Sequence, residues 1–178
     1  MIQDIKPKLN QEYYTNEDFP IYAAEWIKEN LDLSTIKLFN EYNYGSYLLF
    51  QGIPVMIDSR ADLYSPEFNA TKDSSGIDIF MDVQNVCTGD AKYSDVFKEY
   101  GITHVITYSD SSLNSKLKKD KNYKKIYPNA QQAELDERFI IYEKVSSDND
   151  ESQKDDTEAI SNKSILQSNK TIESNQAE

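Results

Sequence analysis

The fold is indicated by residues 36–58, which read IKLFNEYNYGSYLLFQGIPVMID. Residues 36–41 and 54–58 are short apolar runs of the kind that form β-strands. Between them, residues 44–51 carry apolar side chains at helical spacing, and Gly52 is suited to end that helix. A connection of about a dozen residues is near the minimum that joins two parallel strands. The stretch therefore predicts a strand–helix–strand unit with parallel strands.

The same alternation continues on both sides of this unit. Apolar spacing predicts helices over residues 20–31, 93–100 and 113–119, the last capped by Ser111 or Ser112. Further strands are predicted over residues 103–108, 123–127 and 139–143, and the last two are expected to pair as an antiparallel hairpin. The polar stretch 59–90 indicates only a short helix or an irregular turn near 77–86. The predicted fold is α/β: a three-layer sandwich with a mostly parallel central sheet and an antiparallel edge hairpin.

Composition divides the chain into three parts. Residues 1–18 are polar without periodicity and are expected to be a linker, and residues 19–145 form the predicted globular domain. Residues 146–178 contain no Phe, Tyr or Trp and more acids than lysines. Such a segment buries too little apolar surface to offset its ordering entropy, so a disordered acidic tail is predicted.

Charge and missing motifs exclude several classes of function. The net charge of −12, from 19 basic and 31 acidic residues, disfavours nucleic acid, whose phosphates need cationic partners. No stretch approaches the ~18–20 apolar residues of a membrane span. The lone Cys87 and the lone His104 are read as packing residues rather than catalytic ones. Phosphate-binding glycine loops are absent, and no cofactor is expected.

Polar residues follow the two strands of the first unit, where ligands bind in open α/β sheets. The candidate binding residues are Asn40, Glu41, Asn43 and Tyr44 after the first strand, and Asp58, Arg60, Asp62 and Tyr64 after the second. If the two strands are neighbours, the two groups face each other.

Two interpretations of these residues stay open. In the functional one, Glu41, Asp58 and Asp62 could hold a divalent cation, while Arg60 could bind a phosphate or carboxylate. In the structural one, Arg60 pairs with Asp58 or Asp62 and fixes the loop to the sheet, and the asparagines satisfy backbone groups.

Two segments also resemble a known class of protein. Residues 40–48 have the pattern Asn-x-Tyr-x-Tyr-Gly-x-Tyr-Leu, and residues 58–64 have Asp-x-Arg-x-Asp-x-Tyr. Together with the helix from Pro20, these are similar to the C-terminal region of bacterial multi-pass membrane proteins that resemble polyprenyl-phosphate-sugar-dependent (GT-C-like) glycosyltransferases. The similarity covers roughly residues 15–144.

The resemblance implies a role outside the membrane. The chain would be a non-catalytic domain, water-soluble by itself, on the extracytoplasmic face of a membrane parent protein. Its partner would be the membrane portion of that parent, and its candidate ligand a glycan or lipid-linked sugar. The alternative is a self-contained metal-dependent enzyme that acts on a sugar phosphate or a similar anionic substrate.

Overall fold

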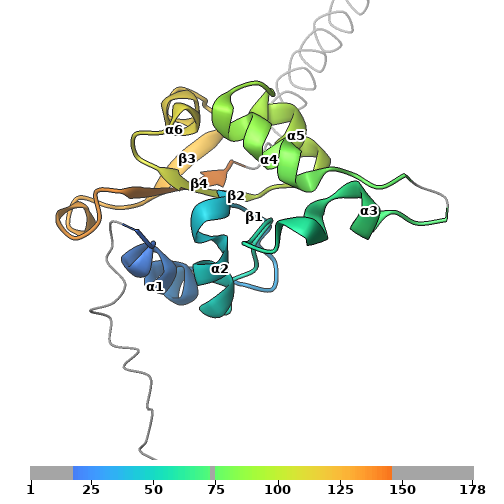
Figure 1. The fold of residues 1–178 in the computed structure, drawn as a ribbon. Coiled ribbons are helices and arrows are strands. Elements are labelled where there is room, and N and C mark those ends of the chain that lie inside the picture. Colours follow the sequence, from blue (N-terminus) through green and yellow to red (C-terminus); the bar gives the residue numbers. More distant parts are fainter. Residues whose placement is uncertain (1–17, 73–74, 146–178) are drawn as a thin grey trace, which may run out of the picture. The chain divides into compact units, whose positions relative to one another are not determined.

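A computed structural model describes residues 18–72 and 75–145 of the chain (Figure 1). Its α-helices are α1 (Ile21–Asn30), α2 (Tyr42–Phe50), α3 (Pro66–Asn69), α4 (Ile79–Thr88), α5 (Tyr93–Glu99) and α6 (Ser112–Leu117), with 3₁₀ turns η2 (Ala61–Tyr64) and η3 (Gln132–Glu134). The strands are β1 (Leu38–Phe39), β2 (His104–Tyr108), β3 (Tyr123–Tyr127) and β4 (Phe139–Lys144). The linker predicted over 1–18, save Asp18, and the tail predicted over 146–178 lie outside the described residues.

The four strands form one mixed sheet in the order β1-β2-β4-β3. Only β1 and β2 are parallel, with Leu38 opposite His104, whereas β4 runs antiparallel to both of its neighbours. The predicted antiparallel hairpin at one edge is therefore confirmed as β3–β4. The prediction of a mostly parallel sheet is wrong, because β4 returns along β2 and takes the central position beside it.

The second strand predicted in the first unit, residues 54–58, is also wrong. That segment forms no strand, bends at Met56 and does not join the sheet. The amide of the buried Asn40 takes the place of a strand partner: its Oδ1 accepts from the Met56 N–H (2.8 Å), and its Nδ2 donates to the Ile57 carbonyl (2.8 Å). A side chain thus satisfies backbone groups that a neighbouring strand would otherwise satisfy.

Alternating side chains of the strands build two separate cores, one on each face of the sheet. Leu38, Ile106 and Ile141 pack with α1 and α2, through side chains such as Ile27 and Leu48. The other face presents residues from the same strands to α4, α5 and α6: Phe39, Val105, Ile140 and Tyr142. Helices consequently cover both faces, with α1 and α2 on one side and α4, α5 and α6 on the other (Figure 1).

The remaining predictions agree closely with the observed elements. Helices form in all four ranges expected from apolar spacing, as α1, α2, α5 and α6, and the weakly indicated segment 77–86 becomes α4. Ser111 is the cap of α6, where its side chain accepts from the Asn114 N–H. In the described part of the chain, no helix combines the length and the apolar character that a membrane crossing requires.

Candidate functional site

The carboxyl ends of the parallel strands β1 and β2 bring Glu41 and Thr107 together. Glu41 comes just after Asn40, which follows β1, and has extended backbone at the start of α2. Its Oε1 accepts from the Thr107 hydroxyl (2.8 Å) and, at 3.4 Å, from the Tyr108 N–H. The Thr107 hydroxyl also lies 2.8 Å from the hydroxyl of Ser111, the cap of α6. The result is a short chain of hydrogen bonds from the start of α6 to the Glu41 carboxyl.

The surroundings of Glu41 favour its neutral form. Burial raises the pKa of this carboxyl, the hydrogen bonds from Thr107 and Tyr108 oppose that rise, and the nearby Asp110 adds to it. A half-buried carboxyl with a raised pKa is the kind of group that serves as a proton donor or acceptor. The neighbouring thiol is not a matching nucleophile, because burial and the charge of Glu41 raise the pKa of Cys87 to about 12.

Two of the candidate residues near Glu41 have structural roles. Asn40 holds the 54–58 segment, as described above. Tyr44 is fully buried, donates its hydroxyl to the Ile106 carbonyl (2.8 Å) and lies edge-on to the rings of Tyr108 and Phe139. Asn43, by contrast, is exposed on α2 and its side chain reaches the Tyr108 hydroxyl.

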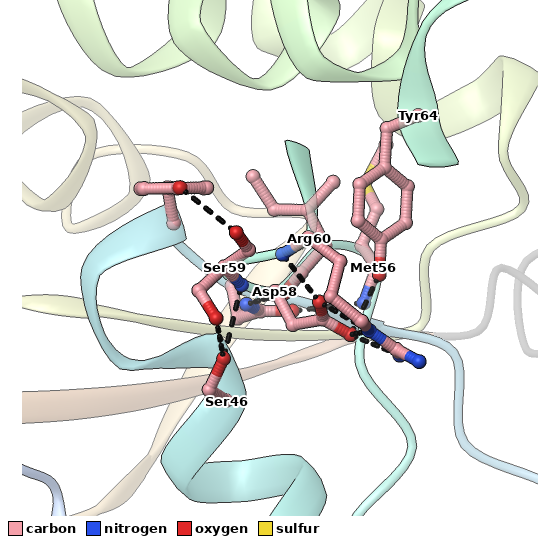
Figure 2. A network of polar contacts seen from close by, with 9 residues as sticks. Ser46, Met56, Asp58, Ser59, Arg60 and Tyr64 are labelled. Atoms are coloured by element: carbon pink, nitrogen blue, oxygen red, sulfur yellow. Dashed lines mark hydrogen bonds and ion pairs between the residues drawn. The ribbon is translucent and has the colours of Figure 1, made fainter. Parts of the chain in front are cut away.

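The second candidate group forms a self-contained cluster around the buried Asp58 (Figure 2). Arg60 donates to it from Nε (2.9 Å to Oδ1) and from Nη2, and the Arg60 backbone N–H also donates to Oδ1. The Tyr64 hydroxyl donates to Oδ2 (2.8 Å). The contacts with Arg60 hold the pKa of Asp58 well below its usual range, so the carboxylate stays ionised.

These contacts hold the loop that follows residue 58 against the Asp58 carboxylate, where the loop begins. The Arg60 side chain is 59 % exposed, whereas the Asp58 side chain is 1 % exposed, so Arg60 remains largely open to solvent. Burial and the Asp58 carboxylate both raise the pKa of Tyr64, which therefore acts as a donor. These contacts agree with the structural interpretation, in which Arg60 pairs with Asp58 and fixes the loop. The exposed part of the Arg60 side chain is the part that an anion could still reach.

Helix α2 connects the two groups. The Ser46 hydroxyl bonds to the Ser59 hydroxyl (2.6 Å) and accepts from the Ser59 N–H (3.0 Å) (Figure 2). The Tyr42 hydroxyl donates to the Ser59 carbonyl. Gly45 allows this approach, because a Cβ atom there would lie 2.0 Å from the Ile57 carbonyl oxygen. The two groups are therefore neighbours through α2, although Glu41 and Asp58 have different bonding partners.

The structure does not gather Glu41, Asp58 and Asp62 into a metal site. Glu41 bonds to Thr107 of β2, Asp58 bonds to Arg60 and Tyr64, and Asp62 is exposed in η2. Within residues 18–72 and 75–145, no three or more His, Cys, Asp or Glu side chains are placed to hold a metal ion together.

Sequence reasoning missed Thr107 as a residue of this region and predicted Ser111 only as a helix cap. Thr107 lies at the carboxyl end of β2 and Ser111 follows it at the start of α6, in the region where the strand-end rule places ligands. The polar run Ser109–Ser112, directly after an apolar strand, was the available signal. No protein-family model, no curated protein and no solved structure matches this chain.

Proposed function

We propose that this chain is a non-catalytic docking domain on the extracytoplasmic face of a larger membrane protein that resembles the polyprenyl-phosphate-sugar-dependent glycosyltransferases. It assists acceptor or glycan binding there, and the membrane portion of the parent protein is its main partner. The observation that carries the proposal is a set of exposed large apolar side chains that runs from η2 to α4: Leu63 (45 % exposed), Phe68 (66 %), Ile77 (45 %) and Met81 (45 %).

The position of these side chains supports a contact surface rather than a reaction centre. Scattered exposed apolar residues are ordinary, but four within one segment would expose apolar area that a partner can bury. The segment begins at Leu63, next to Tyr64 of the Asp58–Arg60–Tyr64 cluster, and the cluster fixes its start to the body of the domain. The cluster thus has a supporting role for the surface.

The first test asks whether the native protein is part of a membrane assembly. An antibody against residues 18–145 is used to probe membrane and supernatant fractions of the source cells. The proposal expects a membrane band well above the 20.5 kDa of this chain. A band near 20.5 kDa confined to the supernatant contradicts it, and so does sustained turnover of a sugar-phosphate donor by the purified chain.

The second test locates the contact surface. In a Cys87→Ala background, Phe68→Cys is labelled with a membrane-impermeant maleimide before and after the domain is released by proteolysis. Protection of position 68 before release, and its loss afterwards, is expected. Glu99→Cys, at the end of α5, is the matched control and should be labelled equally in both states. Equal labelling of position 68 in both states would exclude this segment as the contact.

A further inference from the structure

A groove of about 170 Å³ lies between α1 and the end of β3 with the loop that follows it. Its lining combines aromatic, acidic, amide and aliphatic side chains from these segments: Tyr22, Glu25, Trp26, Glu29, Tyr127, Gln132 and Leu135. Because α1 covers one face of the sheet and the loop joins β3 to β4, the groove is formed only when the chain is folded.

The aromatic wall of the groove is held in place. The rings of Trp26 and Tyr127 pack with centroids 5.5 Å apart. The Tyr127 hydroxyl donates to Oδ2 of the buried Asp136 (2.8 Å), whose Oδ1 accepts the N–H groups of Arg138 and Phe139. This carboxylate ties the end of β3 to the start of β4, so the Tyr127 ring and the loop form a rigid side of the groove.

The charged side chains that line the groove are both acidic. Glu25 and Glu29 are exposed and lie one turn apart on α1, where two like charges repel. Among the described residues, neither carboxylate forms an ion pair within 4.0 Å. The lining contains no Lys or Arg among the described residues. The nearest cations in sequence have other partners: Lys28 donates to Gln51 (2.9 Å), and the Arg138 guanidinium stacks 5.0 Å from the centre of the Tyr108 ring.

We infer that this groove is a binding site for a ligand carrying a primary ammonium group on an aliphatic stem, such as a lysine side chain or a small diamine. The ammonium is attracted to the Glu25 and Glu29 carboxylates and to the faces of nearby rings. The aliphatic stem lies against Trp26 and Leu135, which is 62 % exposed. Anions are repelled by the same carboxylates, so the site selects by charge.

Trp26 makes the inference directly measurable, because it is the single tryptophan of the chain. Its fluorescence is titrated with Nα-acetyl-lysine methylamide and with the Nε-acetylated form of the same compound, which has nearly the same shape but no charge. We expect a saturable change with the charged probe, with a dissociation constant on the order of 1 mM, and at least tenfold weaker binding of the neutral one. Raising the salt from about 0.02 M to about 0.2 M should weaken binding of the charged probe several-fold.

Variants assign the site to the named residues. Glu25→Gln and Glu29→Gln should each weaken binding of the charged probe about threefold, as expected for one exposed charge pair. Glu99→Gln removes the same charge from α5, on the opposite face of the sheet, and should leave binding unchanged. Tyr22→Leu keeps an apolar side chain but removes a ring that can face the cation, so it should also weaken binding.

The outcomes separate the alternatives. Titration with putrescine distinguishes the two sources of the ammonium group: tighter binding of the lysine amide indicates a protein partner, and tighter binding of putrescine indicates a free amine. Equal binding of the charged and neutral probes, or a response only to neutral sugars such as glucose and N-acetylglucosamine, would overturn the inference. So would an unchanged Trp26 signal up to about 20 mM probe. None of these readouts depends on a membrane partner.

Discussion

Arg60 and Asp58, two positions apart in the loop after residue 57, form a forked ion pair in which Nε and Nη2 of the guanidinium both donate to the carboxylate. Bidentate geometry of this kind fixes orientation as well as charge. The pair stabilises the charge of the buried Asp58 carboxylate, which also accepts a hydrogen bond from the Tyr64 hydroxyl.

Asp58→Asn should destabilise the domain in a pH-dependent way. The carboxylate has a lowered pKa in the fold and a pKa of about 3.9 when unfolded. Its contribution is therefore present above about pH 4 and is lost as the pH falls through the folded value. We expect a loss of about 1–3 kcal/mol at pH 7, measured by urea unfolding, and a smaller gap from the wild type at about pH 3.

Asp62→Asn is the control for this prediction, because Asp62 is exposed in the same loop. It should change the free energy of unfolding by less than about 0.5 kcal/mol at either pH. A gap for Asp58→Asn that stays constant from pH 7 to pH 3 would mean that the charge of Asp58 is not what stabilises the loop.

Gly45→Ala should lower stability although alanine favours helices. The substitution gains about 1 kcal/mol of helix propensity in α2. The new Cβ, however, would lie 2.0 Å from the Ile57 carbonyl oxygen and 2.7 Å from the Asn40 Nδ2. We expect a net loss of about 1–3 kcal/mol in urea unfolding.

Gly52 provides the contrasting case. It has φ of 79°, and an added Cβ would meet nothing within 4 Å, so only its backbone conformation resists substitution. Gly52→Ala should cost about 1–2 kcal/mol, and Gly52→Asn less, because Asn adopts positive φ more readily. If Gly45→Ala proved neutral, α2 would have to be able to move away from residue 57.

Glu41→Gln should change the pH dependence in the opposite direction to Asp58→Asn. The pKa of Glu41 is raised in the fold, so the folded state holds its proton more tightly than the unfolded state. Ionisation of Glu41 therefore reduces wild-type stability as the pH rises above about 4.3. Relative to the wild type, the variant should be more stable at pH 7 than at pH 4, as measured by urea unfolding at both values.

The matched control for Glu41 is Glu99→Gln, whose carboxylate is exposed at the end of α5. As an exposed surface substitution, it should change the free energy of unfolding by less than about 0.5 kcal/mol. A difference for Glu41→Gln that does not vary with pH would show that the Glu41 carboxyl is as well solvated in the folded state as in the unfolded one.

Cys87 should be a poor nucleophile in the native protein. Its pKa is raised to about 12 by burial and by the charge of Glu41, so little thiolate forms at pH 8. We expect alkylation by iodoacetamide, followed by mass spectrometry, to be at least about a hundredfold slower in the native state than in urea. Equal rates in the two conditions would show that the thiol is accessible and ionises normally.

Apolar spacing within short segments predicted the helices and the hairpin, whose formation depends mainly on residues near in sequence. The helices near Pro20, Tyr93 and Ser111, and the β3–β4 hairpin, follow from apolar spacing within short segments. The pairing of β2 with β4 was missed, because nothing within either strand encodes which distant strand becomes its neighbour. Residues 54–58 were misassigned for a related reason: their apolar run fits a strand, but the Asn40 side chain satisfies their backbone instead.

The contacts of the candidate residues were also predictable only in part. The pairing of Arg60 with Asp58 could be anticipated, since the two are close in sequence and opposite in charge. The contact of Glu41 with Thr107 could not, because it requires the parallel register of β1 and β2. The groove beside Trp26 joins segments distant in sequence, so no motif marks it.

The two edge strands of the sheet affect the tendency of the domain to aggregate at high concentration. One edge strand, β1, has only two residues, Leu38–Phe39, and offers little free backbone. The other, β3, carries the exposed Lys124 and Lys125 and has a register shift next to Lys125. Short length, lysines and irregular register all discourage one sheet from extending into another. The domain is thus built to resist edge-to-edge aggregation and fibril growth at high concentration.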